Sequence, residues 1–102
     1  MANVKVSFSV QPKTQVEELY IVGSTSSLGN WDAAKATKLT YCNECQKFVV
    51  SKMLPAGEVV EFKFISSTDW NNVEKGTWKE DIANRTIVPE KGLNVELTIE
   101  NF

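Results

Sequence analysis

The sequence contains no histidine, and this absence removes several kinds of chemistry at once. Without an imidazole there is no Ser–His or Cys–His nucleophile pair and no histidine-based metal site. Two cysteines supply only half of the four ligands that a structural zinc site needs. No metal and no cofactor is therefore expected, and any catalysis would depend on carboxylates, lysine or cysteine.

The two cysteines, Cys42 and Cys45, lie in the segment CNEC between two stretches of strand character. Redox-active CxxC motifs instead place the first cysteine at a helix N-terminus, which lowers its pKa. The setting favours an incidental loop pair, joined as a disulfide outside the cell. A redox role or a shared metal is the alternative.

Basic clusters and long apolar runs are also missing. Eleven Lys and Arg residues against thirteen Asp and Glu give a net charge of −2, which argues against nucleic acid as a partner. No stretch approaches the ~20 apolar residues of a membrane span. The opening MANVKVSFSV alternates polar and apolar residues and lacks the apolar core of a signal peptide. Cytoplasmic location and origin in a secreted enzyme both stay open.

Period-two alternation dominates the rest of the chain and predicts half-buried strands. No long amphipathic helix is found, and residues 32–38 are expected to form a turn at most. We expect a single domain of residues 1–102, an all-β antiparallel sandwich of immunoglobulin-like architecture with about seven to eight short strands. The clearest predicted strands are residues 4–10, 18–22, 46–53, 58–66, 85–88 and 93–100.

All three tryptophans fall outside these strands and have polar neighbours: Trp31, Trp70 and Trp78. A tryptophan is usually buried, so a loop anchor is the plain interpretation of each one. Since the inward strand positions already carry Val, Phe, Leu and Ile, an exposed aromatic platform becomes the competing hypothesis. Indole rings stack on the C–H face of a sugar, whereas a single-strand nucleic-acid binder would add a basic groove. Carbohydrate is therefore favoured as the partner.

Three segments, LYIVGSTSSLGNWDAAKATKL, MLPAGEVVEFKFI and NRTIVP, resemble in order and spacing the starch-binding domains of carbohydrate-binding module family 20. The resemblance implies non-catalytic binding of α-1,4-glucans such as starch, glycogen, maltooligosaccharides and cyclodextrins. We expect a monomer, which is either free-standing or a module of an amylase (a glycoside hydrolase), a glucanotransferase or a phosphatase-type glycogen regulator. Gly23 and Gly29 would shape the first loop and Leu28 would pin it to the core.

In that family one site pairs two tryptophans with a lysine and an asparagine. Matched by motif, these are Trp31 in LGNW, Lys63 in EFKF, a second tryptophan, and Asn84 in NR. The spacing favours Trp78 over Trp70 as the second ring, although one inserted residue must be allowed. Glu80 is expected either to accept a sugar hydroxyl or to be simply solvated.

The family's second site is expected to be degraded or absent, because its tyrosine is replaced by Gln15 here. Tyr41 could contribute to that face, but a plain sheet or loop aromatic is the favoured interpretation. Phe48 is expected to replace a core tryptophan.

Two rival functions remain. A glycosidase needs two carboxylates about 5–9.5 Å apart in a cleft, and no carboxylate pair lies in a motif. An immunoglobulin-like protein-interaction module would use the tryptophan-bearing loops as a hot spot.

Overall fold

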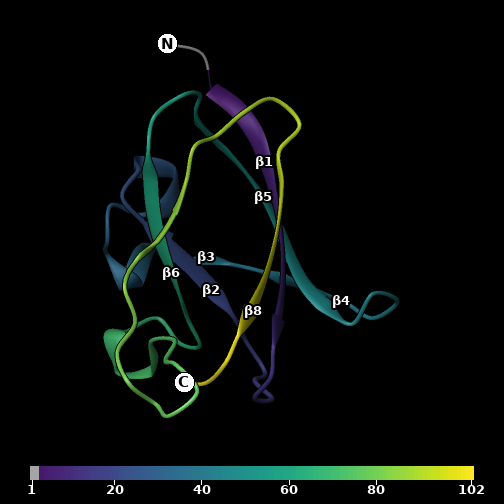
Figure 1. Ribbon diagram of the computed structural model, residues 1–102, viewed down its shortest axis with the longest axis vertical. Helices are drawn as coiled ribbons and strands as arrows, with labels where there is room; N and C mark the ends of the chain where they lie inside the picture. Colours follow the sequence, from purple (N-terminus) through teal and green to yellow (C-terminus); the bar gives the residue numbers. More distant parts are fainter. Residues whose placement is uncertain (1–2) are drawn as a thin grey trace.

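A computed structural model describes residues 3–102 as two four-stranded β-sheets (Figure 1). Sheet A has the order β4-β5-β1-β8, with β1 (Asn3–Pro12), β4 (Thr40–Cys42), β5 (Lys47–Pro55) and β8 (Asn94–Ile99). Sheet B has the order β3-β2-β6-β7, with β2 (Tyr20–Gly23), β3 (Thr37–Lys38), β6 (Val60–Ile65) and β7 (Arg85–Ile87). The predicted all-β sandwich is confirmed. The first two residues of the expected 1–102 domain lie outside the described residues.

The helices of residues 3–102 are three 3-10 turns: η1 (Ser26–Leu28), η2 (Ala33–Lys35) and η3 (Trp70–Asn72). None of them has the length or the apolar content that crossing a bilayer requires. The expectation of no more than a turn over residues 32–38 is confirmed by η2, whose N-terminus is capped by the Asp32 side chain (3.1 Å to the Ala34 N–H).

Six strands match the predicted ones to within a few residues, and β4 coincides with the strand character expected just before CNEC. The strand β3 was not predicted, because its two residues are too few to show alternation. One pairing departs from the antiparallel expectation. β1 pairs antiparallel with β5 but parallel with β8. No hairpin joins the first and last strands, so alternation alone does not set the direction in which they pair.

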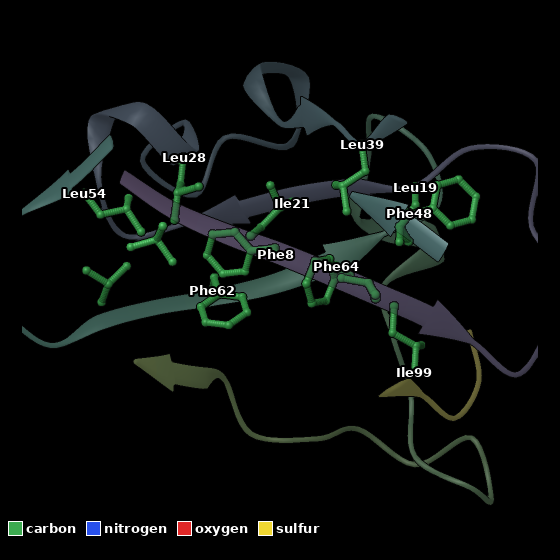
Figure 2. Packing of buried hydrophobic residues seen from close by; sticks show 13 residues of the cluster. Phe8, Leu19, Ile21, Leu28, Leu39, Phe48, Leu54, Phe62, Phe64 and Ile99 are labelled. Carbon is green, nitrogen blue, oxygen red and sulfur yellow. The ribbon is translucent and has the colours of Figure 1, made fainter. Parts of the chain in front are cut away.

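The core lies between the two sheets and is built from the alternating apolar positions (Figure 2). Three phenylalanines form its centre: the Phe8 and Phe62 ring centroids lie 5.4 Å apart and those of Phe62 and Phe64 lie 5.7 Å apart, both edge to face. Such T-shaped pairs are favoured by the ring quadrupoles. Phe48 is also buried, as expected.

A second, smaller apolar cluster covers the outer face of sheet B. Val22 on β2 and Ile65 on β6 are fully buried beneath Ala33 of η2, and Val73 packs at its margin. The segment that follows Trp31 is therefore held on the sheet by apolar contacts.

Cys42 and Cys45 form a disulfide across the turn that joins β4 to β5. Of the two interpretations of CNEC, the structure supports a loop disulfide. Among the described residues, no cluster of acidic or sulfur ligands could hold a metal ion.

The edge of β6 that faces away from β2 pairs with two separate segments, one around Val73 and the other β7. Ile65 pairs with Val73 and Phe62 pairs with Arg85, both antiparallel. Moving from one pair to the other takes three steps on β6 (65 − 62) but twelve on its partner (85 − 73). The partner side therefore carries nine additional residues. The ten residues 75–84, between Glu74 and Arg85, are called the excursion here.

Two adjacent valines test the burial pattern. Val60 is 1% exposed and Val59 is 68% exposed. Val60→Ala should lower the free energy of unfolding by about 2 kcal/mol, because it removes buried methyl groups and leaves a cavity. Val59→Ala should change it by less than about 0.5 kcal/mol. Urea unfolding of both variants is the measurement, and equal losses would contradict the assigned register.

Candidate functional site

Trp31 ends a tight loop with an unusual backbone. Gly29, Asn30 and Trp31 all have positive φ angles, of 85°, 50° and 63°. The Trp31 N–H donates to the Gly23 carbonyl at the end of β2 (2.9 Å). A left-handed conformation at a bulky residue costs about 1–3 kcal/mol, and such residues concentrate at functional sites. Leu28 is fully buried, so the predicted anchoring of this loop is confirmed.

Trp70 begins η3 in the Trp70 loop, defined here as residues 66–72. The Asp69 carboxylate accepts from the Asn71 N–H (2.9 Å) and from the Ser67 hydroxyl (3.1 Å). The Asn72 amide in turn donates to the Ser67 hydroxyl oxygen (3.1 Å). These local bonds give the loop a defined shape, although few apolar side chains pack within it.

The rings of Trp31 and Trp70 lie together. Their centroids are 6.3 Å apart and their planes are tilted by 38°. Trp31 is half-buried, and Trp70 retains 43% of its surface exposed. Trp78 belongs to none of the ring pairs formed by the described residues. The motif spacing favoured Trp78 as the partner of Trp31, whereas the structure brings Trp70 to it.

Lys63 lies on the outer face of sheet B, and Asn84 directly precedes the neighbouring strand β7. Lys63 is paired with Val22 on β2, and its two neighbours on β6 are buried, so its side chain points away from the core as predicted. Its ammonium donates to the Ile82 carbonyl (2.7 Å). Continuing the β6–β7 register by one step places the exposed Asn84 beside Lys63.

Trp78 occupies the tip of a small hairpin within the excursion. Lys75 pairs with Asp81 through the main chain and through an ion pair, and the Gly76 N–H donates to the Glu80 carbonyl (2.9 Å). The Glu80 carboxylate accepts from the Trp78 N–H (2.9 Å) and fills the space that a Cβ at Gly76 would take. Trp78 is 87% exposed at the end of this braced turn.

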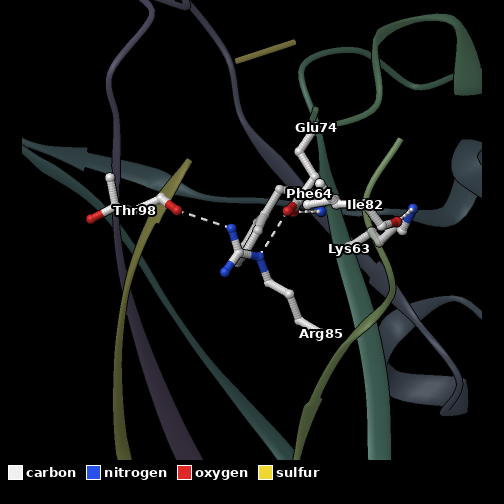
Figure 3. A network of polar contacts seen from close by, with 6 residues as sticks. All are labelled: Lys63, Phe64, Glu74, Ile82, Arg85 and Thr98. Carbon is white, nitrogen blue, oxygen red and sulfur yellow. Dashed lines mark hydrogen bonds and ion pairs between the residues drawn. The ribbon is translucent and has the colours of Figure 1, made fainter. Parts of the chain in front are cut away.

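A buried ion pair behind these loops was missed by the sequence reasoning (Figure 3). Glu74 is fully buried, and its two oxygens accept from the Phe64 N–H (2.7 Å) and from Arg85 Nε (2.8 Å). Arg85 also donates to the Thr98 carbonyl on β8 (2.9 Å). Burial raises the pKa of Glu74 above its ordinary value of 4.5, against the lowering effects of Arg85, the Phe64 N–H and Lys63. Because Glu74 stands in a polar segment without periodicity, its sequence context resembles that of a solvated residue.

The position expected for a second site is a separate pocket. It is lined by Gln15, Tyr41, Gln46 and Phe48, among others. Tyr41 is 47% exposed and meets Phe48 edge to face at 5.1 Å between centroids. Tyr41 therefore has the contacts of a sheet aromatic, and the degraded second site stays a prediction.

Comparison with known proteins decides the family. The sequence profile of a family described as starch binding domain matches residues 3–98. The chain belongs to the starch binding domain family. Members of this family are non-catalytic modules that bind starch, and they occur as accessory modules of glycoside hydrolases.

Curated relatives of this starch binding domain are much longer proteins. A thermophilic beta-amylase of Thermoanaerobacterium thermosulfurigenes is 31% identical over 101 residues, which cover 96% of this chain and 18% of that protein. An alpha-amylase of Streptomyces violaceus is 42% identical over 91 residues, 84% of this chain and 15% of that protein. The chain spans less than a fifth of the length of the curated relatives it matches.

Solved structures agree with the fold. The family 20 carbohydrate-binding module of a maltotetraose-forming amylase from Pseudomonas saccharophila superposes with a TM-score of 0.69 at 26% identity, over 93% of this chain and 99% of that one. A glucoamylase of Hypocrea jecorina gives a TM-score of 0.78 at 24% identity over 99% of this chain and 18% of that one, a likeness of fold alone.

The raised pKa of Glu74 predicts a specific dependence of stability on pH. Between pH 4.5 and the native pKa the folded starch binding domain holds a proton that the unfolded chain releases. The free energy of unfolding contributed by Glu74 is therefore present below pH 4.5 and lost as the pH rises through the native pKa.

Glu74→Gln should remove this slope. The carboxyls of Glu18 and Asp81 have lowered pKa values, because Tyr20 and Lys75 respectively hydrogen-bond to them, and their slopes have the opposite sign. They titrate in both proteins, so the difference in urea unfolding between wild type and Glu74→Gln from pH 4 to 7 isolates Glu74. A difference that stays constant with pH would contradict the assignment.

Proposed function

We propose that this starch binding domain binds α-1,4-glucans on a platform formed by the rings of Trp31 and Trp70. The observation that carries the proposal is the ring pair itself: two indoles 6.3 Å apart, tilted by 38°, in a chain of this family. Two tilted rings form a bent floor for consecutive sugars. A helical α-1,4-glucan is curved in the same sense, whereas a β-1,4-glucan is flat.

Lys63 and Asn84 are suited to hold the hydroxyl rim of a glucan bound on this face. An ammonium has three donors, and the Ile82 carbonyl takes one of them, which leaves two for sugar hydroxyls. The Asn84 amide offers both a donor and an acceptor. Net gains are about 1 kcal/mol for a neutral hydrogen bond and roughly twice that when one partner is charged. With the entropy of association to offset, a Kd of about 10 µM to 1 mM follows for a short oligosaccharide.

Trp78 is assigned a separate contribution. Its ring is flanked by polar side chains and 87% exposed, and the Glu80 carboxylate braces the turn that presents it. A single ring among polar groups suits one more sugar of a long chain. It suits a protein partner less well, because interface hot spots sit within a larger desolvated apolar patch. In this proposal Glu80 orients Trp78 and does not itself hold a sugar hydroxyl.

We further propose that the domain acts as a monomeric accessory module of a glycoside hydrolase or glucanotransferase. The support is that the relatives it matches are starch-acting enzymes of which it resembles only a small part. Tethering to such an enzyme would raise the effective affinity for a polymer.

The first prediction concerns Trp31. Maltoheptaose or β-cyclodextrin at millimolar concentration should quench the tryptophan fluorescence of the wild type, and cellohexaose should not. Trp31→Ala should weaken binding by more than about tenfold, since the platform loses one of two stacking faces, while the circular dichroism of the sheets stays unchanged. Trp31→Phe should keep part of the affinity. A wild-type protein without any response to the two α-glucans would reject the proposed function.

The second prediction compares the two remaining tryptophans by isothermal titration calorimetry. Trp70→Ala should weaken β-cyclodextrin binding by about tenfold, whereas Trp78→Ala should change it by less than about threefold. On amylose, which can reach beyond the ring pair, Trp78→Ala should show a larger loss. The reverse order on β-cyclodextrin would restore Trp78 as the partner of Trp31, as the motif spacing indicates.

A further inference from the structure

Glu74 lies at the common root of both loops that carry the proposed glucan site. The Trp70 loop ends just before it, at Asn72, and the excursion with Trp78 and Asn84 begins just after it. Arg85, its ion-pair partner, is the first residue after the excursion. The Glu74–Arg85 pair therefore joins the two ends of the ten residues 75–84.

The pair also supplies hydrogen-bond partners for β6 where the edge of sheet B is interrupted. The Glu74 N–H donates to the Phe64 carbonyl (2.9 Å), as in a regular ladder, and its carboxylate then accepts the Phe64 N–H (2.7 Å). On the far side, the Arg85 guanidinium lies over the Phe64 ring, 5.7 Å from its centroid, and reaches the Thr98 carbonyl of β8. Figure 3 shows these contacts converging on β6.

Stability alone does not account for a buried carboxylate here. Among the described residues Glu74 is the one charged side chain that is buried. Desolvation is the largest influence on its titration and opposes the charged form. Replacing a buried ion pair by apolar residues of similar volume is often neutral or stabilising, so a buried pair at this position points to a requirement for geometry.

Other charged groups near the pair serve the same two loops. Lys63 on β6 holds the excursion through the Ile82 carbonyl, and Lys75 closes the Trp78 hairpin through its ion pair with Asp81. The Lys75 N–H also donates to the Asn101 carbonyl near the C-terminus (2.8 Å), which lies beside these loops in Figure 1. The excursion is thus tied to β6 through Lys63 and to the C-terminal segment through Lys75, the residue that follows Glu74.

We propose that Glu74 and Arg85 are positioning residues of the glucan site: their buried ion pair sets the angle at which the Trp70 loop and the excursion leave β6. The proposal rests on the proposed function. It makes the Trp31–Trp70 ring geometry, and with it glucan affinity, depend on a pair that touches no sugar.

The decisive variant is the double replacement Glu74→Gln with Arg85→Met. The glutamine carbonyl keeps the hydrogen bond from the Phe64 N–H, and the methionine keeps the apolar stem over the Phe64 ring, while the charge pair and the bond to the Thr98 carbonyl are lost. Lys13→Met with Glu100→Gln is the matched control, because it removes an exposed ion pair (2.9 Å) that lies next to Asn101, the partner of Lys75, and leaves the Glu74–Arg85 pair intact.

Three readouts separate positioning from plain structural support. Maltoheptaose affinity should fall about tenfold in the double variant. The exciton couplet of the two indoles in far-UV circular dichroism, identified by its loss in Trp70→Ala, should weaken. The urea midpoint should stay near the wild-type value. The control pair should leave all three unchanged. A double variant with wild-type affinity and couplet, whatever its urea midpoint, would overturn the proposal.

Arg85→Lys provides a second test that does not depend on the double variant folding. Lysine keeps the charge but cannot bond Glu74 and the Thr98 carbonyl through a rigid fork. Affinity should fall about threefold and the couplet should weaken in parallel, and wild-type values of both would again overturn the positioning role. Failure of the wild type itself to bind maltoheptaose would instead reject the proposed function and the positioning role together.

Discussion

The candidate site depends on a side chain that takes the place of a main-chain hydrogen-bond partner. This happens at the point where the edge of sheet B is interrupted. An edge strand that leaves its sheet for ten residues normally exposes unpaired N–H and C=O groups on its neighbour. Here Glu74 supplies both partners for Phe64, an N–H to its carbonyl and a carboxylate to its N–H. The core under Phe64 stays closed, and the chain is free to carry a long polar segment away from the sheet.

The other half of the platform depends on a close approach of main chains. A Cβ on Gly23 would lie 2.5 Å from the Glu61 carbonyl oxygen and 2.8 Å from the Leu28 side chain, so only glycine lets the loop after β2 lie against β6. The loop then ends in three left-handed residues, Gly29, Asn30 and Trp31, and the Trp31 ring lies beside that of Trp70. The strain is supported by the buried Leu28 and by the apolar cluster under η2, which are part of the rigid sandwich.

The sequence predicted those features of the fold and of the candidate site that leave a local pattern in the chain. Alternation predicted the inward set of β6 and the outward direction of Lys63, and the family resemblance predicted that Leu28 is anchored in the core. Alternation did not predict the two-residue strand β3 or the parallel pairing of β1 with β8, because neither leaves a local pattern. The ring partner of Trp31 and the burial of Glu74 depend on how many residues leave the edge of the sheet. That number is set by tertiary structure and cannot be predicted from motif spacing.

If the proposed glucan site is correct, the weakness of each sugar contact explains why its few residues are surrounded by so many ordered polar contacts. Each sugar stack and hydrogen bond gives only about 1 kcal/mol or a little more, while ordering a flexible residue costs about 1–2 kcal/mol. A loop that became ordered only on binding would therefore cancel the contacts it makes. The Trp70 loop is ordered beforehand by Asp69 and Ser67, and the excursion by Lys75, Glu80 and the ion pair at its root. In the proposed site, polar side chains that do not contact the glucan would hold the loops in place, so that the two indole rings can bind it.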